Sequence, residues 1–168
     1  MQKNAFTLIE LIVVMVIISI AALLAIPMIS SAADVQVRSA ANMIAADLDY
    51  AKSMAISTQQ YYSVVFDPAN DSYEVHDAGG VIEHPLKPGS DFVVDLQSDG
   101  RLSRVDIAGA DFDPGSQPAV TFDYLGSPYS GTTTANPLNT GQISLQADSF
   151  TMTVTVEPMT GYVTVTVP

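Results

Sequence analysis

The 168-residue sequence contains no cysteine, which excludes disulfides, thiolate catalysis and cysteine-ligated metal sites. Positive charge is also scarce, because 6 lysines and arginines stand against 18 aspartates and glutamates, for a formal net charge of −12. Phosphate binding depends on basic residues, so this balance argues against a nucleic-acid partner.

Catalytic motifs are missing as well. The two histidines, His76 and His84, have no partner at metal-ligand spacing. The sequence has no GxSxG motif, no phosphate-binding glycine loop and no nucleophile with a neighbouring base. We therefore expect a protein that is not an enzyme and that needs no cofactor.

The chain is nevertheless 48% hydrophobic, and much of this content lies in one N-terminal run. From Phe6 to Ile26 the sequence is apolar except for Thr7, Glu10 and Ser19, which is the length of a transmembrane helix. Lys3 precedes the run, so the positive-inside rule places this end in the cytoplasm. The rest of the chain is expected on the outer side of the membrane.

Three kinds of segment have to be compared with this run. A secretory signal peptide has a shorter apolar core and a small-residue cleavage site after it, which residues 30–33 (SSAA) could imitate. A plain membrane anchor explains the length but not Glu10, because a lone carboxylate at membrane depth costs about 2–4 kcal/mol. The third kind is a class III signal, which is cut before the apolar helix.

A close resemblance is carried by the string FTLIELIVVMVIISIAALLAIP. It is similar to the N-terminus of type IV prepilins and type II secretion pseudopilins. The resemblance implies that prepilin peptidase cuts between Ala5 and Phe6 and that the new N-terminus is methylated. It also places Glu10 at the acidic position of the family and Pro27 at its helix-disrupting proline. The family usually has glycine before the cut; Ala5 is also small, and we expect processing at this bond.

Cleavage would give Glu10 a partner. The new amine at Phe6 would lie four residues away, which is one helical turn. In lipid, an ammonium and a carboxylate can compensate each other where neither is stable alone, and the amine could come from the same chain or from the previous subunit of a filament. Pro27 removes a helical donor, so we expect the helix to kink or loosen there.

After Pro27 the apolar residues recur at spacings of four and three, which predicts an amphipathic helix over residues 28–60. Its apolar face would consist of Val37, Ala41, Ile44, Leu48, Ala51 and Ala55. The stripe resembles a short coiled-coil seam, but its residues are small. We therefore expect this helix to pack on a sheet of its own chain.

Beyond Gln60 the hydrophobic period changes to two, which predicts strands. The expected strands cover residues 61–67, 73–77, 91–97, 101–107, 120–126, 142–147, 150–158 and 162–168, the last two forming a hairpin around Thr160 and Gly161. No long helix interrupts them, so a mainly antiparallel sheet or sandwich is expected. The polar stretch Ser127–Gly141 is expected to be a mobile or partner-contacting loop.

This order of elements extends the resemblance to GspH/FimT-type minor pilins and MSHA-type accessory pilins. It implies an α+β pilin fold with a leader (1–5), a transmembrane assembly helix (6–27), an amphipathic stalk helix (28–60) and a β-rich domain (61–168). It also implies a single-pass inner-membrane protein with a cytoplasmic N-terminus and a periplasmic domain, which enters a periplasmic or extracellular filament. The implied partners are other pilins or pseudopilins, prepilin peptidase and an inner-membrane assembly platform.

Two functions follow from the resemblance: a structural subunit of a pilus-like or secretion filament, and a tip adhesin that binds through Ser127–Gly141. DNA uptake is disfavoured, because DNA-binding relatives use basic residues near the C-terminus and this chain ends EPMTGYVTVTVP. Some pseudopilins bind calcium, and a weak candidate site is the turn with Asp67, Asn70 and Asp71. Such residues are also common in ordinary turns.

Overall fold

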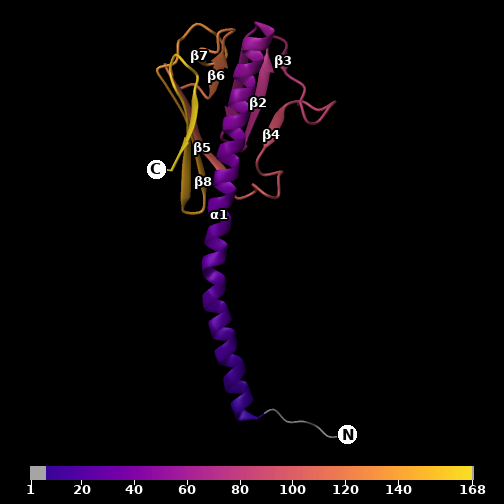
Figure 1. Cartoon of the computed structure of the whole chain (residues 1–168), viewed down its shortest axis with the longest axis vertical. Helices are drawn as coiled ribbons and strands as arrows, with labels where there is room; N and C mark the ends of the chain where they lie inside the picture. The colour runs from indigo at the N-terminus through magenta and orange to yellow at the C-terminus, as the bar shows by residue number, and fades with distance from the viewer. Residues whose placement is uncertain (1–6, 168) are drawn as a thin grey trace.

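The computed structural model describes the backbone of residues 7–167 and all of their side chains except those of residues 23–31. One long helix, α1 (Leu8–Thr58), is followed by strands that form two antiparallel sheets. The first half of α1 stands clear of the sheets, and its second half lies along them (Figure 1). The predicted α+β class with a helix on antiparallel sheets is therefore confirmed.

Both ends of α1 have side-chain or backbone features that define them. Thr7 is the N-cap, with an extended backbone and a hydroxyl that accepts a hydrogen bond from the Glu10 N–H at 3.4 Å. The helix ends at Thr58 and is capped by Gln59, whose φ of 56° is left-handed. The helix is continuous through position 27, but the side chain of Pro27 lies outside the described set, so the predicted kink remains a prediction.

No helix in the described part of the chain is long and apolar enough to cross a membrane. The span expected from the sequence also includes residues 6 and 23–27, which lie wholly or by their side chains outside that part.

The first sheet has the order β3-β2-β1-β6-β7, and β4 pairs with β2. Its strands are β1 (Tyr62–Asp67), β2 (Ser72–Asp77), β3 (Gly80–Val81), β4 (Val93–Asp95), β6 (Ala119–Phe122) and β7 (Pro128–Ser130). The second sheet has the order β10-β9-β8-β5. Its strands are β5 (Asp106–Asp113), β8 (Thr140–Ala147), β9 (Phe150–Val156) and β10 (Val163–Thr166).

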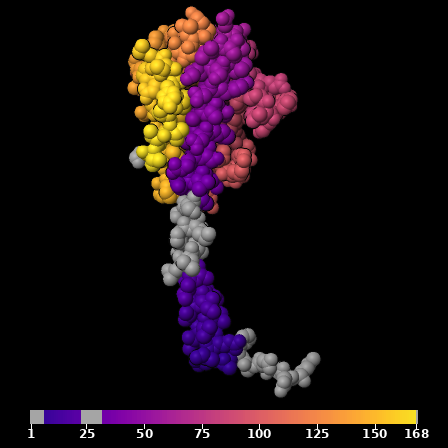
Figure 2. All heavy atoms as spheres, viewed as in Figure 1, coloured from indigo at the N-terminus to yellow at the C-terminus, as the bar shows by residue number. Residues whose placement is uncertain are grey.

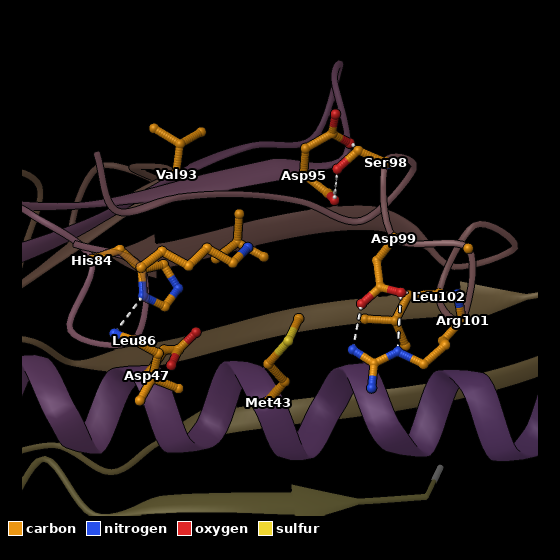
Figure 3. A pocket seen from close by; sticks show the side chains of 13 residues that line it. Met43, Asp47, His84, Leu86, Val93, Asp95, Ser98, Asp99, Arg101 and Leu102 are labelled. Atoms are coloured by element: carbon orange, nitrogen blue, oxygen red, sulfur yellow. Dashed lines mark hydrogen bonds and ion pairs between the residues drawn. The ribbon is translucent and has the colours of Figure 1, made fainter. Parts of the chain in front are cut away.

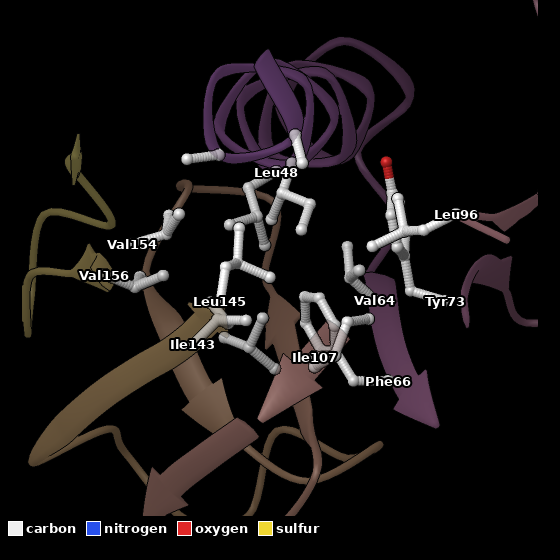
Figure 4. Packing of buried hydrophobic residues seen from close by; sticks show 14 of the residues in the cluster. Leu48, Val64, Phe66, Tyr73, Leu96, Ile107, Ile143, Leu145, Val154 and Val156 are labelled. Atoms are coloured by element: carbon white, nitrogen blue, oxygen red, sulfur yellow. The ribbon is translucent and has the colours of Figure 1, made fainter. Parts of the chain in front are cut away.

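The core lies where α1 meets both sheets. All six residues of the predicted apolar face, from Val37 to Ala55, are buried, and Ala33 and Ala40 extend this face. Leu48 points from the helix toward Leu145 of the second sheet, while Val64 lies on the side of the first sheet (Figure 4). The alanines let the helix approach the sheets closely, and the prediction that this face packs on the chain's own strands is confirmed.

Two of the expected strands and one expected loop differ from the structure. Residues 101–105 form turns closed by the Leu102 N–H to Asp99 O bond at 2.8 Å, so β5 begins only at Asp106. The strand expected over residues 120–126 ends at Phe122, because the Asp123 carboxylate accepts the N–H groups of Leu125 and Ser127 and forms a turn.

The stretch Ser127–Gly141, which was expected to be a loop throughout, contains strand residues. Residues 128–130 form β7, which pairs with β6, and β8 begins at Thr140. Pro128 is compatible with this strand because β7 is the edge of its sheet. The hairpin of β9 and β10 is confirmed, with residues 157–162 as its connection.

Candidate assembly surface

Glu10 lies in the first turn of α1, where an acidic side chain is favoured by the helix dipole. Its N–H is held by Thr7 through the carbonyl at 3.1 Å as well as the hydroxyl, and the Leu11 N–H bonds the same carbonyl at 3.2 Å. Within the part of the chain that the structure describes, Glu10 forms no ion pair. The predicted processing residues, Ala5 and Phe6, lie outside that part.

The first half of α1 is apolar on every face. Each large hydrophobic residue from Leu8 to Ile20 is exposed, including Leu11, Val14 and Ile18. The hydroxyl of Ser19 is turned inward, donating to the Met15 carbonyl at 2.8 Å. A helix that is hydrophobic all round is stable only inside a membrane or against other protein. We therefore expect a membrane or another protein to cover this segment.

The second half of α1 is covered on one face only. Its opposite face begins with the apolar Val35 and continues at spacings of four and three with small or polar side chains, namely Ser39, Asn42, Ala46, Asp49 and Ser53; all six residues are exposed. Small side chains let another helix approach closely. This face of the second half therefore suits lateral packing against another helix, and Figure 2 shows this half of the helix lying open on the domain.

In the turn that was a calcium candidate, the carboxylates of Asp67 and Asp71 already accept hydrogen bonds from other groups of the protein. Asp67 accepts the Asn70 side-chain amide at 2.6 Å and the Ala69 N–H at 3.1 Å. The two oxygens of Asp71 accept the Ile107 N–H at 2.8 Å and the Gln97 amide at 3.1 Å. Among the described residues, no group of three or more histidines and acids is arranged to hold a metal ion.

A cleft of about 540 Å³ lies between α1 and the loops around β4 (Figure 3). Its helix side is formed by Met43 and Asp47, and its loop side includes His84. Asp47 accepts a hydrogen bond from the buried Tyr73 hydroxyl. Burial raises the pKa of Asp47, an effect reduced by that hydrogen bond and by His84. Burial and the neighbouring Asp47 raise the pKa of Tyr73 well above its usual range.

His84 and Asp99, which also line the cleft, have structural partners. His84 Nδ1 accepts the Leu86 N–H at 3.1 Å, and its ring packs on Phe92 with the centroids 4.4 Å apart. Asp99 binds Arg101 through two hydrogen bonds of 2.8 and 3.1 Å, which lower the pKa of Asp99 to about 2. The one serine hydroxyl among the described residues that line the cleft, that of Ser98, donates to the Asp95 backbone carbonyl at 2.9 Å and not to a side-chain base.

Sequence reasoning did not find the bond between Asp47 and Tyr73. The available signal was the position of Asp47 beside the apolar face, three residues after Ile44 and one before Leu48, where a carboxylate becomes half-buried. The other histidine, His76, lies in β2 and is 2.8 Å from Glu74 Oε2. It contributes to the surface of the sheet and not to the cleft.

Two family models match this chain. Residues 1–26 match the family described as prokaryotic N-terminal methylation motif, and residues 40–161 match the family described as type II transport protein GspH. No relative was found among the curated proteins.

Two solved structures are similar. The minor pseudopilin EpsH from the type 2 secretion system of Vibrio cholerae has a TM-score of 0.54 at 14% identity, over 79% of this chain and 98% of EpsH. The type IV minor pilin FimU of Pseudomonas aeruginosa has a TM-score of 0.47 at 17% identity, over 79% of this chain and 87% of FimU. The EpsH comparison shows a shared fold.

Proposed function

Because the chain belongs to the GspH family of type II transport proteins and is a minor pilin or pseudopilin subunit, not an enzyme, we propose that α1 is the element through which it enters a filament. The observation that carries this proposal is the first half of α1, which exposes apolar side chains on every face. Membership of this family identifies the chain as a membrane-anchored subunit that assembles with other pilins. It also favours this role over that of a tip adhesin.

The proposed maturation step is cleavage by prepilin peptidase between Ala5 and Phe6, followed by methylation of the new N-terminus. The methylation motif in residues 1–26 supports this step. The new amine would lie one turn before Glu10, whose place in the first turn of α1 is fixed by Thr7. Pairing of Glu10 with the amine of a neighbouring subunit would set the axial register of the filament.

The proposed topology is a single pass through the bacterial inner membrane, with the N-terminus in the cytoplasm and residues 61–168 in the periplasm. The position of Lys3 before the apolar run supports this orientation. An inner-membrane assembly platform would then extract the subunit from the bilayer into the filament. Pro27, near the outer edge of the span, would provide a stretch of helix that can loosen during this transfer.

Replacement of Glu10 by alanine tests the registry role. The Glu10→Ala protein is expected to insert into the membrane normally, because its apolar run is intact, but to be recovered in sheared filaments about tenfold less, as a pairing worth about 1.4 kcal/mol would require. The matched control is Asp111→Ala, which removes an exposed acid from β5 and should leave recovery unchanged. Normal recovery of the Glu10→Ala protein contradicts the role.

We also propose that the subunit needs no bound cofactor. Because Asp67 and Asp71 already accept N–H donors, calcium is expected to change neither the heat signal in calorimetric titration nor the melting temperature of the protein. Saturable heat together with a rise in melting temperature, both lost in the Asp71→Asn variant, would instead establish the turn of Asp67, Asn70 and Asp71 as a calcium site.

A further inference from the structure

Exposed large hydrophobic side chains also gather at one end of the domain, which we name the distal pole. They come from the C-terminal end of α1 and its exit, the β6–β7 turn and the β9–β10 turn. Figure 1 places these three segments at the end opposite the first half of α1. The distal pole consists of Ile56, Tyr61, Tyr124, Leu125, Met159 and Tyr162.

Close backbone packing joins the three segments into one surface. A Cβ atom at Gly126 would lie 3.0 Å from Ile56 Cδ1, and a Cβ atom at Gly161 would lie 2.7 Å from the Gly126 carbonyl oxygen. Both glycines have positive φ, of 82° and 59°. Lys52 fastens the same junction from the helix, because its Nζ donates to the Gly161 carbonyl at 3.0 Å.

The turns that present the apolar side chains are held by hydrogen bonds. Asp123 accepts the N–H groups of Leu125 and Ser127 at 2.9 and 2.8 Å. In the other turn, the Gly161 N–H bonds the Glu157 carbonyl at 3.0 Å, next to Met159, whose side chain is 86% exposed. A surface fixed in this way loses little conformational entropy when a partner binds. A contiguous exposed apolar patch of this kind is typical of an interaction site.

A shallow hollow of about 350 Å³ adjoins the patch. Its lining includes Tyr61, Tyr124 and Tyr129, with Gln59 at the end of α1. Tyrosine combines a large apolar ring with a polar tip and is enriched at protein interfaces. The hollow therefore suits side chains of another protein.

The charge around the distal pole is negative. Glu157 is exposed in the β9–β10 turn, Asp123 is buried in the β6–β7 turn, and the exposed Asp49 lies on α1 two helical turns before Ile56. Among the described residues that form the junction, the cation is Lys52, whose ammonium is already shared between the Gly161 carbonyl and Asp49, 3.7 Å away. A second copy of this chain, with its net charge of −12, would bring acid against acid, and an anionic membrane would be repelled in the same way.

We propose that the distal pole docks a different polypeptide, whose contact surface has apolar side chains bordered by lysine or arginine. The inference goes beyond the proposed function, because packing through α1 leaves this end of the molecule uncovered. It rests on the apolar patch, the fixed turns and the acidic border together. Charge complementarity of this kind selects the partner and orients it, while the apolar centre supplies the affinity.

Site-specific photocrosslinking in cells that produce the full chain tests the proposal. p-Benzoylphenylalanine placed at Met159 is expected to form an adduct with a different polypeptide, and mass spectrometry of the joined peptide should find lysine or arginine beside the crosslink. The matched control is the same probe at Leu86, which is 84% exposed but lies on another part of the surface, and which should give no such adduct. Glu157→Lys in the probe-bearing chain should lower the yield at least about fivefold, through like-charge repulsion at the border.

Because Met159, Tyr162 and Glu157 are exposed, substitutions there should leave the melting temperature unchanged, and this is measured for each variant. A probe at Val13 reports separately on packing through α1. An adduct at Val13 without one at Met159 overturns the docking proposal and leaves the proposed function standing, whereas loss of both overturns the proposed function as well. An adduct between two copies of this chain, or a yield unaffected by Glu157→Lys, also overturns the docking proposal.

Discussion

Asp47 shows how the environment of one residue changes its chemistry. It is a half-buried carboxylate on α1 whose pKa is raised by desolvation, and its hydrogen bond from Tyr73 and the nearby His84 only partly offset that cost. The folded state therefore holds the proton of Asp47 more tightly than the unfolded state does. The ionised form of this residue weakens the fold, although the Tyr73 hydroxyl needs an acceptor at this position.

The substitution Asp47→Asn is expected to remove this pH dependence while keeping an acceptor for Tyr73. Below the ordinary pKa of 3.8, Asp47 is protonated in both the folded and the unfolded state. As the pH rises through the raised pKa, the wild type loses stability because its folded state binds more protons than its unfolded state. The free energy of unfolding of the variant, measured by urea denaturation at each pH, should therefore rise relative to that of the wild type across this window. Above the window the difference between the two free energies should be constant.

The matched control is Asp111→Asn, which removes an exposed carboxylate from β5 that forms no ion pair among the described residues. It reports the general effect of taking one negative charge from an acidic protein. A variant at position 47 that loses stability against the wild type as the pH rises would contradict the role assigned to its burial.

At the scale of elements, α1 and the second sheet are held together by more than apolar contact. Lys52 spans from the helix to the β9–β10 turn, 109 residues later, and its side chain is only 20% exposed. A charged donor in such a place contributes more than a surface ion pair, because water competes with it less. The position of the hairpin on α1 depends on this contact as well as on the core.

The substitution Lys52→Met should lower the free energy of unfolding by about 1.5–3 kcal/mol, the usual contribution of a hydrogen bond that involves a charged group. Helix propensity changes little, because lysine and methionine are similar. The matched control is Arg38→Met, which breaks the exposed Arg38–Asp34 pair at 3.3 Å and should cost no more than about 0.5 kcal/mol. Equal losses in the two variants, measured by urea denaturation, would show that the Gly161 contact adds nothing.

At the scale of the whole molecule, α1 divides into two parts with different environments. Among the described residues, the buried core begins at Ala33, and every large hydrophobic residue from Leu8 to Ile20 lies outside it. The part of α1 from Ala33 onward belongs to the domain. The part from Leu8 to Ile20 is an apolar surface that needs contact with a membrane or a neighbouring subunit.

A chain shortened to residues 32–168 is therefore expected to fold on its own. It retains the whole described core and should unfold cooperatively with a native-like circular dichroism spectrum. The control is a chain shortened to residues 49–168, which lacks Val37, Ile44 and Leu48 and should not fold, because each large core side chain contributes about 2–5 kcal/mol. An unfolded 32–168 chain would show that the first part of α1 supports the domain.

Much of this architecture follows from local patterns in the sequence. The spacing of Val37, Ile44 and Leu48 identified the buried face of α1, and the change to a period of two identified most strands of both sheets. The resemblance of the N-terminal run to type IV prepilins implied a filament subunit, and the family match confirms this role. Hydrophobic periodicity predicts these elements because each of them buries one face, and the residues of that face recur at a fixed spacing within a short stretch of sequence.

What only the tertiary structure decided depends on residues far apart in the chain. Asp71 bonds Ile107 across 36 residues, and Asp123 ends β6 through turn bonds that the pattern of hydrophobic residues does not contain. The distal pole likewise exists only because Ile56, Leu125 and Met159 are brought to one end of the domain. Sequence periodicity determines which face of an element is buried, but the neighbours of an exposed residue are set by how the elements pack.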